Sequence, residues 1–105
     1  MEKNDAVKNK MTAAFRAKLR SIAAGQSAIM QVGKDGVGEN SVSTLDSALA
    51  SRELVKISVL KNCPTDVRET AEALAAATDS EIVTVIGRKA VFYRDSDEHK
   101  ILQLI

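Results

Sequence analysis

Residues 28–60, AIMQVGKDGVGENSVSTLDSALASRELVKISVL, decide the predicted fold. The two ends of this stretch, Ala28–Val32 and Leu54–Leu60, predict strands, and the second alternates apolar and polar side chains as a half-buried strand does. A helix is predicted between them, from Glu39 or Asn40 to Ala50, because apolar residues recur there at helical spacing: Val42, Leu45 and Leu49. A helix between two strands implies a crossover connection, so these strands should pair in parallel.

The flanking segments add two helices and a hairpin. Upstream, a helix is predicted from near Lys10 to Ala24, with an apolar stripe made of Met11, Phe15, Leu19 and Ile22. Downstream, residues 62–66 (NCPTD) are typical of a helix start, and that helix should run to about Ala77. Two strands follow, joined by a hairpin at Gly87-Arg88-Lys89: Ile82–Ile86 and Ala90–Tyr93. The predicted class is α/β, with the order α-β-α-β-α-β-β and a mixed four-stranded sheet packed by three helices.

The chain length of 105 residues predicts one domain. We divide the chain into a flexible lead-in at residues 1–9, a folded domain at residues 10–94 and a C-terminal tail at residues 95–105. The tail ends in apolar residues, namely Ile101, Leu102, Leu104 and Ile105. These residues either dock on the core of the domain itself or offer a surface to a protein partner.

Charge is unevenly distributed although the formal net charge is only +1. Residues 1–20 carry six Lys and Arg against two carboxylates, whereas residues 66–81 carry one Arg against five carboxylates. This asymmetry gives either a preferred face for a polyanion or two ordinary solvated helix faces. Aromatic residues make up only 3% of the chain, which argues against RNA-binding platforms that stack bases on exposed rings.

Few residues could carry catalysis or bind a metal. His99 is the single histidine and has no second ligand at metal-binding spacing, so no metal and no cofactor are expected. Cys63 is the single cysteine; as a nucleophile it would need a base, and a half-buried apolar role is favoured over a small hydrolase or redox activity. A lone cysteine suits a reducing compartment, and there is no secretory signal or membrane-length apolar run. We therefore expect a cytoplasmic protein that is not an enzyme.

The segment Gly33-Lys34-Asp35-Gly36 joins a predicted strand to a predicted helix. Backbone amides of such a loop and the helix N-terminus can hold a phosphate, and two glycines would let it approach without a Cβ in the way. Lys34 adds a positive charge. Asp-Gly is also a common turn pair, so a simple turn is an equal alternative.

Four segments occur in an order and spacing that resemble a known family: MTAAFRAKLRSIA, IMQVGKDGVGENSV, ALASRELVKISVL and VTVIGRKAVFYR. Together they span about residues 11–94. The chain resembles the CRM domain (chloroplast RNA splicing and ribosome maturation) in its stand-alone bacterial YhbY-type form. The resemblance implies a fold similar to the C-terminal domain of translation initiation factor three. Bacterial members of the family are associated with precursors of the large ribosomal subunit, and plant relatives with intron splicing.

The resemblance also implies RNA binding through a GxxG loop, matched here by Gly33, Lys34, Asp35 and Gly36. Basic residues nearby are expected to extend that surface, namely Arg16, Lys18, Arg20, Lys56 and Arg88. From their helical spacing, Arg16 and Arg20 should face solvent together. The expected partner is ribosomal RNA of the large-subunit precursor, with no membrane and no small-molecule substrate. A ribosome-associated protein adaptor that uses the apolar tail is the alternative, and a small hydrolase or redox protein is a weaker one.

Overall fold

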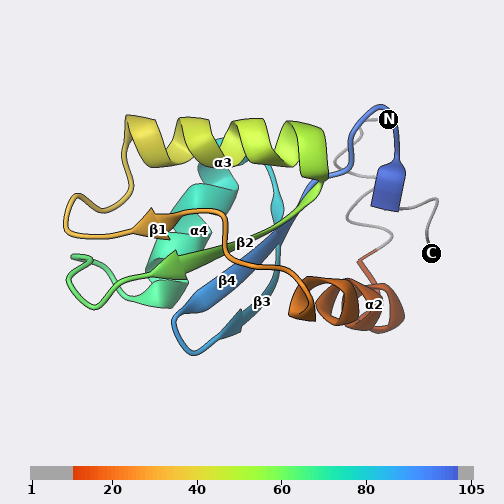
Figure 1. The fold of residues 1–105 in the computed structure, drawn as a ribbon, viewed down its shortest axis with the longest axis horizontal. Helices are drawn as coiled ribbons and strands as arrows, with labels where there is room; N and C mark the ends of the chain where they lie inside the picture. Colours follow the sequence, from red (N-terminus) through yellow and green to blue (C-terminus); the bar gives the residue numbers. More distant parts are fainter. Residues whose placement is uncertain (1–10, 102–105) are drawn as a thin grey trace.

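The computed structural model describes residues 11–101 (Figure 1). Within this range the elements follow the predicted order: α2 (Ala13–Ala24), β1 (Gln31–Val32), α3 (Glu39–Arg52), β2 (Leu54–Val59), α4 (Val67–Thr78), β3 (Glu81–Ile86) and β4 (Lys89–Tyr93). The strands form one sheet in the order β1-β2-β4-β3. The pair β1–β2 is parallel, whereas β2–β4 and β3–β4 are antiparallel. The predicted α/β class and mixed sheet are confirmed.

Element ends differ from the predictions where capping decides them. The Thr12 hydroxyl accepts a hydrogen bond from the Phe15 amide, so α2 begins at Ala13 and not near Lys10. Residues 28–32 run beside β2, but only the last two form regular strand. The helix α3 continues to Arg52, two residues past Ala50, and ends where Glu53 adopts a φ of 69°. A non-glycine residue in this region leaves helical geometry at once.

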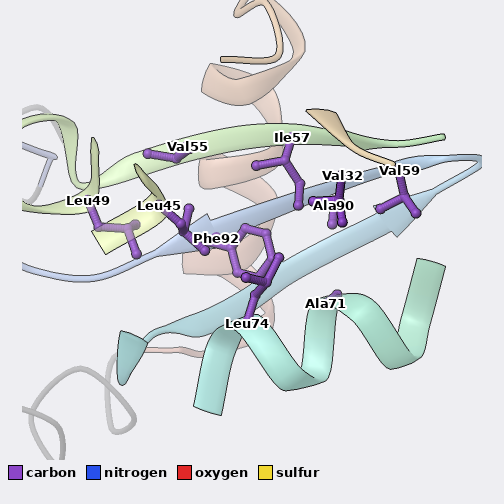
Figure 2. Packing of buried hydrophobic residues seen from close by; sticks show 10 residues of the cluster. All are labelled: Val32, Leu45, Leu49, Val55, Ile57, Val59, Ala71, Leu74, Ala90 and Phe92. Atoms are coloured by element: carbon purple, nitrogen blue, oxygen red, sulfur yellow. The ribbon is translucent and has the colours of Figure 1, made fainter. Parts of the chain in front are cut away.

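Helices cover both faces of the sheet. On one face α3 and α4 enclose the larger apolar cluster, in which Leu74 of α4 points toward Phe92 of β4 (Figure 2). Its buried members are Val32, Leu45, Leu49, Val55, Ile57, Val59, Ala71, Leu74, Ala90 and Phe92. The other face carries α2, whose Leu19 and Ala23 pack with a second set: Leu54, Val83, Val91, Tyr93 and Ile101. Leu54 and Tyr93 of this set lie at the start of β2 and the end of β4, so α2 covers that end of the face, whereas the end next to the β3–β4 turn is left uncovered and carries the exposed Ile86.

The described part of the C-terminal segment is fixed to the domain by Glu53. This side chain is fully buried, and its carboxylate accepts hydrogen bonds from the Ser96 hydroxyl and from the amides of Lys100 (3.0 Å) and Ile101 (2.8 Å). Ile101 is itself 6% exposed and belongs to the second cluster. For Ile101, docking on the core of the domain is confirmed. The predicted lead-in at residues 1–9 and the apolar end from Leu102 lie outside the described residues.

Between residues 11 and 101, no helix has both the length and the apolar character that a membrane crossing requires.

Candidate nucleic-acid interface

The topology brings three loops to one edge of the sheet. The strands β1, β2 and β3 point the same way, because β4 is antiparallel to both β2 and β3. Their carboxyl ends therefore meet, and hydrogen bonds tie them together: Leu60 N donates to Val32 O (2.8 Å), and Val59 N donates to Arg88 O (2.7 Å). Figure 1 shows the loops after β1 and β2 at the left of the view and the β3–β4 hairpin at the lower left of centre. Exposed cations from all three connections lie at this carboxyl edge: Lys34, Lys61, Arg88 and Lys89.

The Gly33–Gly36 loop is a turn. The amide of Gly36 donates to the carbonyl of Gly33 at 2.9 Å, and Gly36 has a φ of 64°. Lys34 and Asp35 stand exposed at its tip. The segment is thus the turn that Asp-Gly predicts, and that turn presents one cation and one carboxylate to solvent.

Packing against a neighbouring loop restricts Gly36 and brings Gly33 into ordinary van der Waals contact with the same loop. A Cβ on Gly36 would lie 3.0 Å from Pro64 Cγ, and one on Gly33 would lie 3.4 Å from both Asn62 Oδ1 and Leu60 Cδ1. The side from which each Cβ is missing therefore faces the loop that joins β2 to α4, and not solvent. The role predicted from the sequence for both glycines, open access for a phosphate to the loop amides, stays a prediction. The positive φ of Gly36 is a second requirement.

A hollow of about 420 Å³ lies between this turn and the first residues of α3. Gly38 is the N-cap of this helix, and its amide donates to Ser41 Oγ at 2.9 Å. Charged residues in the lining are Lys34, Asp35 and Glu39, one cation against two carboxylates. The positive end of α3 favours an anion there, but the two carboxylates oppose it. The hollow therefore suits an anion less well than the exposed cations of the edge do.

Arg16 does not face solvent with Arg20. It is half-buried, and its Nη1 donates to the carbonyls of Ile82 (2.6 Å) and Val83 (2.8 Å) in β3. The register of the β3–β4 pair shifts between Ile82 and Thr84, so the strand is irregular at this point. Such an irregularity disrupts the ladder locally, and Arg16 supplies donors there. The prediction of a solvent-facing arginine pair is wrong for Arg16 and correct for the exposed Arg20.

The remaining predicted residues are spread over the molecule. Arg88 lies at the carboxyl edge with the Gly33–Gly36 loop. Lys56 lies in the middle of β2, half-buried, with its Nζ donating to Gln26 O at 2.9 Å. Lys18 and Arg20 are exposed on α2, which lies at the right of Figure 1, away from the loops. The structure thus brings the loop and Arg88 together and leaves the α2 cations apart from them.

Two cations of the carboxyl edge were not predicted from the sequence. Lys61 directly follows β2, and Lys89 begins β4 with its Nζ 3.2 Å from Ser58 Oγ. Lys61 could have been predicted, because it directly follows a predicted strand and the carboxyl ends of parallel strands share an edge.

Cys63 lies in the loop between β2 and α4. Its sulfur is half-buried, 3.6 Å from Thr70 Oγ1 and 3.8 Å from Thr65 Oγ1. Burial raises the pKa of the thiol, but hydrogen bonds with the Thr65 backbone and with the two hydroxyls outweigh it, so the pKa lies below its usual value. His99 is held by Asp95 through a 2.6 Å contact to Nδ1. Across residues 11–101, the His, Cys, Asp and Glu side chains form no group of three or more that could hold a metal ion.

Comparison with known proteins agrees with this architecture. The family model of the CRS1 / YhbY (CRM) domain matches residues 11–94. The chain is 44% identical over 86 residues to the "Probable RNA-binding protein YqeI" of Bacillus subtilis, covering 82% of this chain and 90% of that protein. It is 34% identical over 95 residues to a probable RNA-binding protein of Methanocaldococcus jannaschii, covering 89% of this chain and 70% of that protein.

A solved structure is similar as well. The solution structure of a hypothetical protein from Staphylococcus aureus, suggested to bind RNA, superposes with a TM-score of 0.73 at 44% identity. The match covers 86% of this chain and 94% of that one. With a family model that spans nearly all of the described residues and relatives at this identity, the chain belongs to the CRS1 / YhbY (CRM) domain family.

Proposed function

We propose that this protein binds RNA through the carboxyl edge of its sheet and assists assembly of the large ribosomal subunit by associating with ribosomal RNA of the precursor. One observation carries the proposal: three connections far apart in sequence place Lys34, Lys61, Arg88 and Lys89 at the same edge. Phosphate contacts of this kind supply affinity for an RNA backbone without base readout. The names of the relatives, which include RNA binding, support the same class of partner.

The turn at Gly33–Gly36 lies at this edge with its side chains toward solvent. We propose that Lys34 contacts a phosphate and that Asp35 points away from it. Arg88 widens the contact at the hairpin, whereas Lys18, Arg20 and Lys56 are secondary contacts for a longer RNA. Arg16 donates its hydrogen bonds to carbonyls of β3, so its contribution to RNA binding is indirect: it holds β3 in place.

The ribosomal part of the proposal rests on the family resemblance, since bacterial members are associated with large-subunit precursors. We propose that the protein carries out no catalytic step and uses no cofactor. We also propose that it acts in the cytoplasm, where it would encounter such a precursor. The adaptor alternative relies on the apolar end of the chain, and Ile101 is not free for that role because it is buried in the domain.

Ultraviolet crosslinking in cells, followed by sequencing of the attached RNA, tests the choice of RNA. We expect reads concentrated on one stretch of large-subunit ribosomal RNA, and more of them from precursor than from mature RNA. Reads spread over messenger or transfer RNA would contradict the ribosomal assignment. If the affinity of the protein for its ribosomal partner does not change with salt concentration, the adaptor alternative is favoured. Neutralisation of phosphates makes binding strongly salt-dependent, whereas an apolar contact does not.

A further inference from the structure

The end of the sheet face that α2 leaves uncovered is hollowed. Side chains of β2, β3 and β4 that point to the α2 face line a hollow of about 400 Å³ next to the β3–β4 turn. Its lining consists of Lys56, Thr84, Ile86, Gly87, Arg88, Lys89 and Val91. The register confirms that strand partners meet there, since Lys56 pairs with Val91, and Ile86 with Lys89. We refer to this feature as the hairpin hollow.

The lining of the hairpin hollow combines apolar surface with positive charge. Ile86 is 67% exposed and is one of two large apolar side chains that stand exposed among residues 11–101, while Val91 forms a buried floor at 4%. The charged residues of the lining are Lys56, Arg88 and Lys89, three cations and no carboxylate. This differs from the hollow beside α3, where carboxylates outnumber the cation. A ligand suited to the hairpin hollow is therefore anionic and carries a flat or apolar part.

Two of these cations are held in place. Lys56 Nζ donates to Gln26 O at 2.9 Å, and Lys89 Nζ donates to Ser58 Oγ at 3.2 Å. Lys56 is half-buried and Lys89 is exposed, as long basic side chains are beside apolar surface. The hollow is therefore formed before any ligand arrives.

We infer that the hairpin hollow binds an unpaired nucleotide of RNA, with its base against Ile86 and Val91 and its flanking phosphates near Arg88 and Lys89. The inference rests on the proposed RNA binding and specifies which part of the RNA enters. Bases of a duplex are paired and stacked, so a duplex presents mainly its backbone, whereas a single strand can lay a base on the protein. The aliphatic floor replaces the aromatic ring on which such bases usually stack.

Continuity with the carboxyl edge favours RNA as the occupant over a protein. The carbonyl of Arg88 accepts from Val59 N, so the hairpin lies directly beside the end of β2 and the loop that carries Lys61. A strand whose backbone contacts Lys34 and Lys61 can continue past Arg88 into the hollow. Three cations without a neighbouring carboxylate in the lining match that polyanion.

Replacing Ile86 tests this inference, because its exposure makes the fold insensitive to the change. Affinity is measured for a single-stranded oligouridine and for an RNA duplex, each at several salt concentrations. For Ile86→Asn we expect a loss of at least about fourfold for the single strand, corresponding to one buried methylene group, with the same salt slope. The affinity of Ile86→Asn for the duplex should equal that of the parent protein. Ile86→Leu should retain the parent's affinity for the single strand.

A charge variant and a matched control complete the experiment. Lys89→Ala should lower the salt slope for the single strand by about 0.7, one phosphate contact. Arg52→Ala removes an exposed arginine at the opposite end of the sheet and should change nothing. If the parent protein binds RNA and folded Ile86→Asn binds the single strand equally well, the hairpin hollow does not hold a base. If the parent protein binds neither RNA, the proposed function itself fails.

Discussion

Glu53→Gln tests the contact that fixes the C-terminal segment to the domain. The Oε2 atom of Glu53 accepts from Ser96 Oγ and from the Lys100 amide, and its Oε1 accepts from the Ile101 amide. In glutamine one of these oxygens becomes an NH2 group, which cannot accept. Either orientation therefore leaves at least one of the two backbone amides facing a donor. A hydrogen bond to a charged group contributes about 1.5–3 kcal/mol, so we expect the free energy of unfolding to fall by about 2–3 kcal/mol.

Urea denaturation followed by circular dichroism measures this loss as a lower midpoint at unchanged slope. Glu72→Gln, an exposed carboxylate on α4, is the matched control and should leave the midpoint in place. An unchanged midpoint for Glu53→Gln at neutral pH would refute the role of this carboxylate in stability.

The pH dependence gives a second readout of the same contact. Burial raises the pKa of Glu53, but the hydrogen bonds from Ser96, Ile101 and Lys100 together lower it below its usual value near 4.5. In acid the folded protein then binds fewer protons than the unfolded chain, so stability falls as the pH falls. The contribution of Glu53 is complete above its unfolded pKa and is lost as the pH drops through the lower, folded one. The difference between the parent protein and Glu53→Gln should therefore shrink below about pH 4.

Three further substitutions have expected outcomes. Arg16→Ala should cost about 2 kcal/mol of unfolding free energy in urea, because two partly buried strand carbonyls lose their donor, whereas Arg20→Ala should cost nothing; equal effects would contradict this. Gly36→Ala should cost about 1–2 kcal/mol, since a Cβ would lie 3.0 Å from Pro64 in a left-handed conformation, and a thermal midpoint equal to the parent's would count against that packing. Cys63→Ser should leave RNA affinity unchanged and lower stability only slightly; loss of RNA binding by the folded variant would overturn its structural role.

Periodicity in the sequence predicted most of the fold, because apolar spacing is a local property. The strand-helix-strand unit at residues 28–60 required parallel pairing of β1 with β2, and this pairing is present. The hairpin from Ile82 to Tyr93 was also predicted, from two apolar runs on either side of a short turn. The turn with Lys34 at its tip was located correctly as well.

Residues whose roles depend on distant partners were not predicted. In the sequence, Glu53 is one carboxylate among others, placed between a predicted helix and a predicted strand. Its hydrogen-bond donors lie 43 to 48 positions later in the chain. Arg16 lies off the apolar stripe of its helix, so its spacing predicted exposure. The carbonyls that it contacts become available only where β3 is irregular, 66 and 67 positions later in the chain.

The contacts that Gly33 and Gly36 make with a neighbouring loop were not predicted, for a related reason. From sequence alone, two glycines in a loop allow close approach of any group. Only the folded chain shows that the neighbouring loop, through Asn62 and Pro64, occupies that side.

Salt-dependent RNA affinity of a Lys34→Ala and Lys61→Ala double variant tests the central claim most directly. Both side chains are exposed, so circular dichroism should show an unchanged fold, and Arg52→Ala, equally exposed but at the other end of the sheet, is the matched charge control. We predict weaker binding of every RNA and a log–log salt slope smaller by about 0.7–0.9 for each phosphate that the variant no longer neutralises, with the control equal to the parent protein. Equal affinity and equal slope for the folded double variant and the parent protein would contradict RNA binding at the carboxyl edge of the sheet.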